Sequence, residues 1–525
     1  MKKFMAMLLA MVMVLSLAAC GAPAEAPAET TAAPAADAPA TEAPATEAEL
    51  EPVTLSIWFH GSNVTPDASA KVMEVLNPIL QEKINVTLEP IWGTWGDFDQ
   101  NVPNAMNAGD NVDIYFTCNW SANEYNKYAK NGHFVKLDDM LEQYAPDLLT
   151  TIPEGIWECA KTNGADGMGI YAVPALKDTA TQICWDVNAT LLAELGFEVP
   201  AKVDYFSDEF EAMLKAAKEA KGADFYPLLI EAAVLERMIT HSAIVTGDVS
   251  GANVLSYYYD AEHPSKDIGA EIVNKYATPE FKAFAERTYY FAQQGYIAPQ
   301  CMQSATANDY RTAAAKEGSY LFGTQSYAYG CEVGYSTERG IDVKMIPETA
   351  PYMDCTSGQG AMMGISTVSK NPERALMFLN LLNSDPEIMT MLNYGVEGFT
   401  YNKNDDGTIS FIKEGRDTYS PWRNGMGNIR LLPAEQAEGA DYWTNFSAYY
   451  DSAEVLPCGS FIFDSSEFEN QAAALGAVYA KYGFNLMAGA VDPATELPKF
   501  LAELETAGIN EFVAAANAQL AEFMK

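Results

Sequence analysis

The sequence predicts an α/β protein with a largely parallel sheet covered by helices, built as two domains behind an N-terminal signal and tether. Three observations lead to this prediction. Stretches with strand and helix periodicity alternate between residues 53 and 116, as in parallel sheets with helical crossovers. The body after the tether, about 475 residues rich in aromatic side chains, is larger than one hydrophobic core usually covers. Residues 21–51 contain no aromatic residue and cannot build a core.

The N-terminus has the pattern of an export signal. Two lysines precede an apolar run over residues 4–17, which is too short for a permanent transmembrane helix. Residues 17–20 read LAAC and resemble the bacterial lipobox, in which the cysteine is acylated and the chain is cut before it. We therefore expect a signal peptide over residues 1–19 and lipid attachment, palmitate included, at Cys20. The alternative is an ordinary signal peptide with a chance cysteine.

The segment after Cys20 has the composition of a tether. Residues 20–51 are almost wholly Ala, Pro, Glu and Thr, so proline stiffens the chain and glutamate repulsion extends it. We expect it to hold a folded body away from the membrane. No later apolar stretch approaches 18 residues, so the expected membrane contact is through the lipid anchor alone, on the extracytoplasmic face.

The charge excludes two classes of partner. A net charge of −39 argues against nucleic acid and anionic lipid, because both require basic patches.

The eight cysteines become seven if Cys20 is acylated, and none of them forms a C-x-x-C pair. Up to three disulfides remain possible, but buried free thiols are the favoured interpretation in a chain of this length.

The first folded elements follow in order. Residues 53–59 alternate between apolar and polar and then meet a break at His60-Gly61, as a strand entering a loop does. Val72, Leu76 and Leu80 share a helical face with two further apolar residues, and strands follow at residues 84–88 and 112–116. In open parallel sheets, ligands bind at the carboxyl ends of the strands. Residues at or just past these ends are therefore candidate site residues: Trp58, Asn119 and Trp120.

Several short segments form a recognisable series over some 350 residues. They are MNAGD at 106–110, DIY at 113–115, GHFVKLDD at 132–139, GIYAVP at 169–174, WDVN at 185–188, and IS at 365–366 followed by SKNPERA at 369–375. In their shared order, these segments resemble family 1 of the extracellular solute-binding proteins, the capture subunits of carbohydrate ABC importers.

Later segments resemble a subgroup of lipoprotein solute-binding proteins with an extra C-terminal domain of unassigned function. They lie at residues 392–398, 482–493, 497–500 and 507–509. Two segments depart from the subgroup: Phe399-Thr400 replaces its usual Lys-His, and residues 421–428 fit its Trp-x-x-Gly-Asn pattern only in part.

The resemblance implies a two-lobed periplasmic-binding-protein-like fold of type II. We expect residues 52–175 and 357–400 in the N-terminal lobe, and residues 180–350 and 401–525, with the extra domain, in the C-terminal lobe. Hinge crossings are expected near residues 173–183 and 345–360, with a third after about residue 395. Rotation about them would close the lobes around a ligand.

A sugar offers apolar C–H faces and a rim of hydroxyls, so its site needs flat aromatic side chains and short polar groups. Trp92 and Trp95 lie in a glycine-rich loop where large rings call for an explanation, although core packing is an equally reasonable interpretation of each tryptophan. Asp97 and Asn119 are polar candidates that turns or helix caps also use. The remaining candidates, near the lobe crossings or in a departing segment, are Tyr171, Gln359 and Trp422.

The resemblance implies capture of a carbohydrate and its delivery to the permease subunits of an ABC importer, by a monomer without a cofactor or metal. Capture of a peptide or another solute is the alternative, and a surface glycoside hydrolase is a weaker one. The sequence has no H-E-x-x-H, G-x-S-x-G or phosphate-loop motif, so an enzyme is not expected. Residues 402–407 suggest a calcium loop, but Lys413 occupies its twelfth position, where such a loop needs glutamate, so a hairpin is expected.

Overall fold

A computed structural model describes residues 50–61, 63–245, 253–354, 356–459 and 461–525. The expected signal peptide, nearly all of the tether and the lipid attachment at Cys20 lie outside these residues. Residues 50–525 group as one compact unit, in which buried side chains form two hydrophobic cores, named here the first and the second core.

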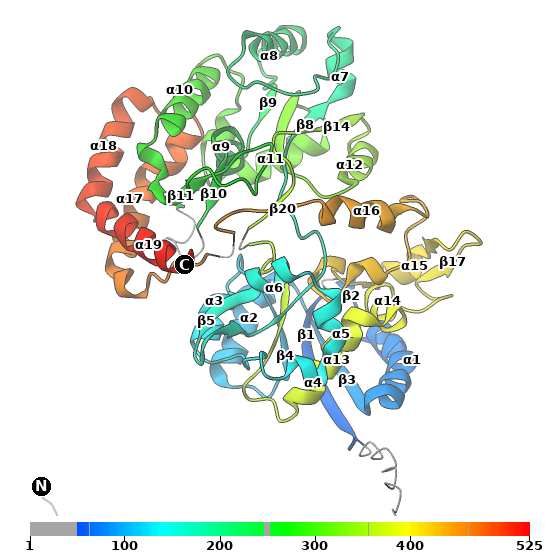
Figure 1. The fold of residues 1–525 in the computed structure, drawn as a ribbon. Coiled ribbons are helices and arrows are strands. Elements are labelled where there is room, and N and C mark those ends of the chain that lie inside the picture. The colour runs from blue at the N-terminus through cyan, green and yellow to red at the C-terminus, as the bar shows by residue number, and fades with distance from the viewer. Residues whose placement is uncertain (1–49, 62, 246–252, 355, 460) are drawn as a thin grey trace, which may run out of the picture. The chain divides into compact units, whose positions relative to one another are not determined.

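The first core surrounds a five-stranded sheet with the order β3-β1-β4-β16-β7, of which β1, β3 and β4 are labelled in Figure 1. β1 pairs in parallel with β3 and β4, whereas β16 is antiparallel to β4 and β7. The expected parallel arrangement is therefore confirmed for the first three strands. The strands are β1 (Val53–His60), β3 (Val86–Gly93), β4 (Ile114–Thr117), β7 (Val173–Pro174) and β16 (Met362–Ile365).

Strand periodicity places β1 as predicted. Leu55, Ile57 and Phe59 are fully buried, and the residues between them are less buried, because successive side chains point to opposite faces of a sheet. The pairing runs from Val53 opposite Val86 to His60 opposite Gly93, so β1 and β3 end together.

Before residue 400, eight helices of the described chain belong to this half of the molecule. α1 buries Val72, Leu76 and Leu80 as expected and contains Pro78 within its length. Val75, which the apolar pattern placed on the same face, is 39% exposed. The helices are α1 (Pro66–Ile84), α2 (Trp95–Ala108), α3 (Tyr125–Lys130), α4 (Leu141–Tyr144), α5 (Pro146–Thr151), α6 (Glu154–Ala160), α13 (Pro372–Ser384) and α14 (Pro386–Tyr394).

The second core contains two sheets, of order β14-β8-β13-β9 and β10-β11-β12. In the first of these sheets, β8 pairs antiparallel with both of its neighbours, whereas β13 and β9 pair in parallel. The strands are β8 (Ile183–Asn188), β9 (Leu228–Leu229), β10 (Ser242–Ile244), β11 (Leu255–Tyr258), β12 (Val273–Asn274), β13 (Phe322–Ser326) and β14 (Val343–Pro347).

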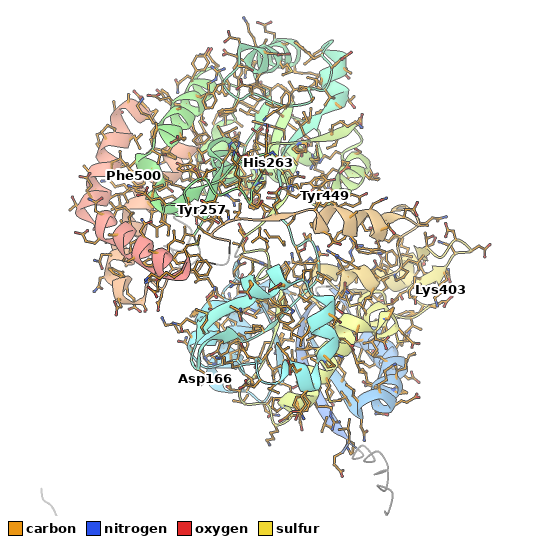
Figure 2. All side chains as sticks on the ribbon, in the orientation of Figure 1. Asp166, Tyr257, His263, Lys403, Tyr449 and Phe500 are labelled. Carbon is orange, nitrogen blue, oxygen red and sulfur yellow. The ribbon has the colours of Figure 1, made fainter. Side chains whose placement is uncertain are left out.

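The C-terminal helices α17, α18 and α19 complete the second core beside α9 and α10 (Figure 1). Phe500 of α18, labelled in Figure 2, is fully buried, and its ring lies 4.9 Å from that of Tyr276. The helices of this half are α7 (Ala189–Glu194), α8 (Asp208–Lys221), α9 (Ala232–Thr240), α10 (Pro279–Gln293), α11 (Ala307–Lys316), α12 (Cys331–Arg339), α17 (Glu469–Met487), α18 (Pro493–Thr506) and α19 (Ile509–Phe523).

The segment 401–450 lies with the first core, whereas we expected residues 401–525 in the C-terminal lobe. Tyr401, Tyr419 and Phe446 are buried in the first core, and β19 pairs with β2 near the start of the chain. Residues 402–407 form the expected hairpin between β17 and β18. The elements are β2 (Asn63–Val64), β17 (Tyr401–Lys403), β18 (Ile409–Phe411), α15 (Lys413–Arg416), β19 (Tyr419–Ser420) and α16 (Tyr442–Asp451).

The chain passes between the two cores three times. The passages lie between Ala175 and Ile183, between Tyr352 and Ala361, and between Tyr450 and Leu456. Two short sheets remain: β5 (Lys161–Gly164) with β6 (Gly167–Ile170), and β15 (Tyr352–Met353) with β20 (Glu454–Val455). The short 3-10 helices are η1 (Lys275–Ala277), η2 (Pro299–Met302), η3 (Arg423–Gly425), η4 (Ile429–Leu431) and η5 (Ser466–Phe468).

The cysteines of the described chain behave mostly as apolar side chains. Free thiols are confirmed at the buried Cys118, Cys184, Cys301 and Cys458 and at the partly buried Cys331, and Cys159 is buried. Cys355 lies outside the described residues. Within those residues, no helix combines the length and apolar character needed to cross a bilayer.

Candidate functional site

Three of the predicted tryptophans meet in one cluster of rings. The Trp95 ring centroid lies 5.2 Å from that of Trp120 and 5.1 Å from that of Trp422, with interplanar angles of 63° and 71°. Below them, His60 stacks on Trp95 at 3.7 Å, and Phe116 lies 5.8 Å from Trp422. We call these five side chains the aromatic cluster.

The strand ends bring the aromatic cluster together. His60 is the last residue of β1, Trp95 is the first residue of α2 just after β3, and Trp120 follows β4. These three parallel strands present their carboxyl ends at one edge of the sheet, the usual ligand edge of such sheets. Trp422 is fixed from the other end of the chain, because its backbone N–H donates to the His60 carbonyl at 3.2 Å.

Two rings of the cluster face solvent. Trp120 is 52% exposed and Trp95 is 37% exposed, while Phe116 is fully buried beneath them. The Trp120 indole is held in place, because its Nε1–H donates to the Gly360 carbonyl at 2.7 Å. Large exposed aromatic surfaces of this kind commonly mark binding sites.

Polar groups lie beside these rings. Lys177 and Asp178 form a 2.6 Å ion pair whose side chains are 13% and 28% exposed. Lys177 is close to the glycine that holds Trp120, since a Cβ built on Gly360 would lie 3.5 Å from Lys177 Nζ. Asn119 is partly exposed, and its backbone N–H donates to the Gln359 carbonyl at 3.1 Å. Rings and hydrogen-bonding groups therefore occur together at this edge.

Two predicted tryptophans lie away from the exposed rings. Trp92 stacks on Phe59 at 5.3 Å, and its Nε1–H donates to Ser69 Oγ at 2.9 Å. Trp58 is partly buried and meets Phe98 edge-on at 6.1 Å. Both rings pack against the first core, which is the alternative that the sequence left open for them.

Tyr171 and Gln359 are fully buried, contrary to the expectation that they face a ligand. The Tyr171 hydroxyl donates to the Gly167 carbonyl at 2.8 Å. Gln359 donates to the Cys159 carbonyl at 2.9 Å and accepts from Asn126 at 3.0 Å. Both side chains stabilise the protein interior and offer no atom to solvent.

Asp97 closes a capping box at the start of α2, instead of reaching toward a ligand. It accepts from the Thr94 backbone N–H and hydroxyl, both at 2.7 Å, and Thr94 in turn accepts from the Asp97 N–H. The Thr94 backbone hydrogen bond, followed by that of the Thr94 hydroxyl, lowers the pKa of Asp97.

The Asp97→Ala variant is expected to lose about 1 kcal/mol of unfolding free energy, the usual cost of removing a helix cap. Urea denaturation measures this loss. Its affinity for the ligand should change by less than about threefold, because the carboxylate stabilises only the helix end. A large loss of affinity at unchanged stability would instead make Asp97 a ligand-contacting residue.

His60, Phe116 and the Lys177–Asp178 pair were missed from the sequence. The break at His60-Gly61 after the first strand marked the right position, but no sequence pattern singles out the imidazole of His60 as part of a ring cluster. The pair lies in the first passage between the cores, where no local pattern separates a site residue from a connector.

Burial lowers the pKa of His60 to about 4, below the ordinary value of about 6.5. The folded state therefore favours the neutral imidazole. Its contribution to stability is complete above pH 6.5 and is lost as the pH falls toward 4, by on the order of 2 kcal/mol. Unfolding free energies at several pH values measure this slope, with His60→Phe as the control that keeps a ring but cannot titrate. Equal slopes in the two proteins would contradict the assignment.

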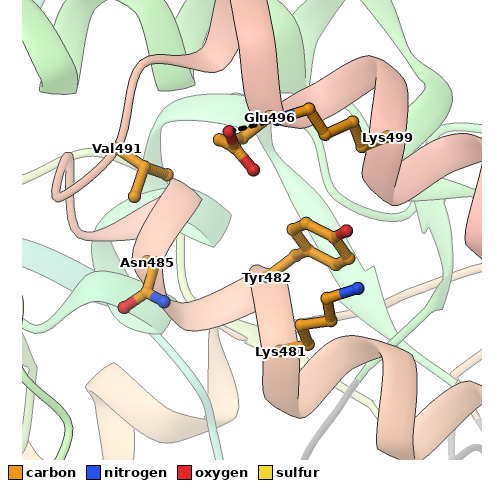
Figure 3. A pocket seen from close by; sticks show the side chains of 6 residues that line it. All are labelled: Lys481, Tyr482, Asn485, Val491, Glu496 and Lys499. Carbon is orange, nitrogen blue, oxygen red and sulfur yellow. Dashed lines mark hydrogen bonds and ion pairs between the residues drawn. The ribbon is translucent and has the colours of Figure 1, made fainter.

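A cavity with a volume of about 260 Å³ lies between α17 and α18, apart from the aromatic cluster. Its charged groups already have partners: Lys499 pairs with Glu496 at 2.7 Å (Figure 3), and Lys481 pairs with Glu503 at 2.6 Å. Tyr482 also donates to Glu503 at 2.6 Å.

In the described part of the chain, no group of three or more His, Cys, Asp or Glu residues is arranged to hold a metal ion.

Comparison with known families identifies two segments. The family described as bacterial extracellular solute-binding protein matches residues 65–389. A domain of unknown function, DUF3502, matches residues 457–525, where the sequence predicted an extra C-terminal domain.

A carbohydrate ABC transporter substrate-binding protein of Streptococcus pneumoniae serotype 4 is 25% identical over 466 residues, covering 88% of this chain and 89% of that protein. Among solved structures, the N-glycan transport solute binding protein of S. pneumoniae has a TM-score of 0.75 at 24% identity, over 90% of this chain and 99% of that one. Its complex with Man1GlcNAc has a TM-score of 0.68 at 23% identity, with the same coverage.

An extracellular solute-binding protein of Bifidobacterium longum subsp. infantis has a TM-score of 0.62 at 16% identity, over 91% of this chain and all of that one. These structural likenesses extend over both cores. The predicted two-lobed solute-binding fold is confirmed.

Proposed function

The chain belongs to the family of bacterial extracellular solute-binding proteins, and from this premise we propose that it captures a sugar or oligosaccharide at the aromatic cluster for an ABC importer. The observation that carries the proposal is the pair of rigidly supported, exposed indoles of Trp95 and Trp120. The similarity of the chain to a carbohydrate ABC transporter substrate-binding protein supports the same class of solute.

The geometry of the rings suits a pyranose. Sugar rings present apolar C–H faces that pack on an indole, and Trp95 and Trp120 offer two such faces at 63° to each other. The perpendicular setting of Trp120 and Trp422, at 87°, adds a third wall. Hydroxyls at the rim of the sugar then reach Lys177, Asp178 or Asn119, which supply donors and acceptors.

Capture becomes a transport signal if the ligand changes the balance between two arrangements of the cores. The three chain passages supply hinges for such a change. A ligand that touches both cores favours the arrangement in which it has more contacts, by its difference in affinity. The ligand-bound form, a monomer, then docks on the permease of the importer, and no turnover of the ligand is expected.

Lipid anchoring at Cys20 is part of the proposal. An anchored capture protein stays at the extracytoplasmic face near its permease, at an effective concentration set by the tether. Metabolic labelling with palmitate is expected to label the wild type and not the Cys20→Ser variant. Equal labelling of both would contradict anchoring at Cys20.

A melting experiment tests the solute class. A bound ligand stabilises the folded state by mass action, so neutral mannose- or N-acetylglucosamine-containing oligosaccharides should raise the melting temperature. Peptides of similar size should leave it unchanged. If a peptide stabilises the protein and no sugar does, the proposed function is wrong.

A further inference from the structure

A cavity of about 510 Å³ lies in the second core, away from the aromatic cluster. Its wall consists of residues 202–206, Ile239, His241 and Glu348. Val203 and Tyr205 are buried members of the second core, and Ile239 packs against it. The volume falls within the range typical of small-molecule sites, and none of the wall belongs to the first core.

Two polar groups meet in this cavity without bonding to each other. His241 Nε2 lies 3.7 Å from Glu348 Oε1, which is too long for a hydrogen bond. The Nε2 atom is buried and has no hydrogen-bond partner among the described residues. A buried imidazole nitrogen in this state is unusual and calls for a partner.

A hydrogen bond from Trp185 holds the Glu348 side chain in place. This side chain is only 9% exposed, and its Oε2 accepts from Trp185 Nε1–H at 3.1 Å. The Trp185 ring, itself fully buried, stacks on Tyr205 of the cavity wall. One carboxylate oxygen is thus occupied, while the other faces His241.

The backbone at His241 is also unusual. This residue follows α9 with a φ of 53°, in the left-handed region that few non-glycine residues adopt. Such conformations are unfavourable for residues other than glycine and persist where the surroundings hold them. Here the conformation belongs to the residue whose imidazole lines the cavity opposite Glu348.

The chemistry of the wall indicates its ligand. A hydroxyl placed between the two groups can donate to Glu348 Oε1 and accept from an Nε2–H of His241, because it is both donor and acceptor. Phe206 is 48% exposed and meets Tyr205 edge-on at 5.5 Å, so it offers a flat apolar face. Lys202 and Asp204 add polar groups to the wall. A compound with one apolar ring face and several hydroxyls satisfies all of these groups.

We propose that this cavity is a second sugar site, which binds one hexopyranose ring through Phe206 and a hydroxyl between His241 and Glu348. The sugar class follows from the groups of the cavity itself. This proposal is therefore independent of the proposal for the aromatic cluster, and either one can be wrong without the other.

The Trp185 indole provides a local probe, because its N–H binds the glutamate that would hold the sugar. The protein is labelled with 5-fluorotryptophan, and the ¹⁹F resonance of Trp185 is assigned with Trp185→Phe. Methyl α-D-mannopyranoside and N-acetyl-D-glucosamine are then titrated into the Trp95→Ala/Trp120→Ala protein, in which the exposed indoles of the cluster are absent. At least one sugar is expected to shift the Trp185 resonance saturably.

Two cavity variants and one control complete the test. Phe206→Ala and Glu348→Gln, introduced separately, should each weaken this response at least tenfold. Phe523→Ala, which removes a phenylalanine of nearly equal exposure at 47%, should leave it unchanged. Absence of a saturable shift, or a shift that survives both cavity variants, overturns the second site. Failure of the proposed function gives a different result: in the wild type, the ¹⁹F resonances of Trp95 and Trp120 do not respond to the added sugar.

Discussion

Replacing Trp95 and Trp120 together by alanine is expected to weaken oligosaccharide binding by about 100- to 1,000-fold, because aromatic anchors at the centre of a site typically contribute 2 kcal/mol or more each. The two indoles are the exposed part of the aromatic cluster, so their removal deletes the stacking surface. Isothermal titration calorimetry measures the change.

Stability is a separate matter for this variant. Phe116 and Phe98 remain beneath the removed rings, in edge-on contact at 5.2 Å, so the sheet edge keeps its core. Phe523→Ala is the matched control, with a similar loss of exposed ring and no expected change in affinity. Wild-type affinity in the double variant would show that the aromatic cluster is not the binding site.

Lys275→Met is expected to lower the unfolding free energy by about 3–5 kcal/mol, the usual effect of removing one partner of a buried ion pair. Lys275 Nζ lies 2.6 Å from Glu236 Oε2, and the two side chains are 3% and 1% exposed. Glu236 Oε1 also accepts from Thr240 Oγ1 at 3.1 Å. Without the lysine, a carboxylate stays buried with only neutral donors.

The same substitution at Lys266 is the control, because Lys266 pairs with Asp260 at 2.7 Å but is 58% exposed. Exposed pairs contribute roughly 0–1 kcal/mol, so Lys266→Met should be nearly neutral in chemical denaturation. The double variant Lys275→Met/Glu236→Leu should recover much of the loss, since the uncompensated charge is gone. Equal effects at Lys275 and Lys266 would contradict this account.

Strand positions were predictable because period-two alternation depends only on neighbours along the chain. β1 and β4 lie within one or two residues of the predicted strands, and the predicted strand at 84–88 extends to Gly93 in β3. A strand end located Trp120 and a glycine-rich loop located Trp95, and the structure brings the two rings together. In this part of the molecule, local pattern and fold agree.

The errors have a common cause, namely partners distant in sequence. Segment 401–450 belongs to the first core because Tyr419 pairs with Val64, some 350 residues earlier, and no local signal announces that pairing. Trp92 is satisfied by Ser69, and Gln359 by Asn126 and Cys159. Asp97 is different, since Thr94-x-x-Asp97 resembles a capping box readable from sequence.

Site-resolved protection from oxidation reports which tryptophans a bound sugar covers. Hydroxyl-radical footprinting with mass spectrometry compares the protein alone with the protein saturated by a mannose- and N-acetylglucosamine-containing oligosaccharide. If the sugar stacks on the aromatic cluster, oxidation of Trp95 and Trp120 falls severalfold, while the exposed Met168 and Phe523 react as before. Unchanged oxidation of both tryptophans in a protein that binds the sugar would contradict binding at the aromatic cluster.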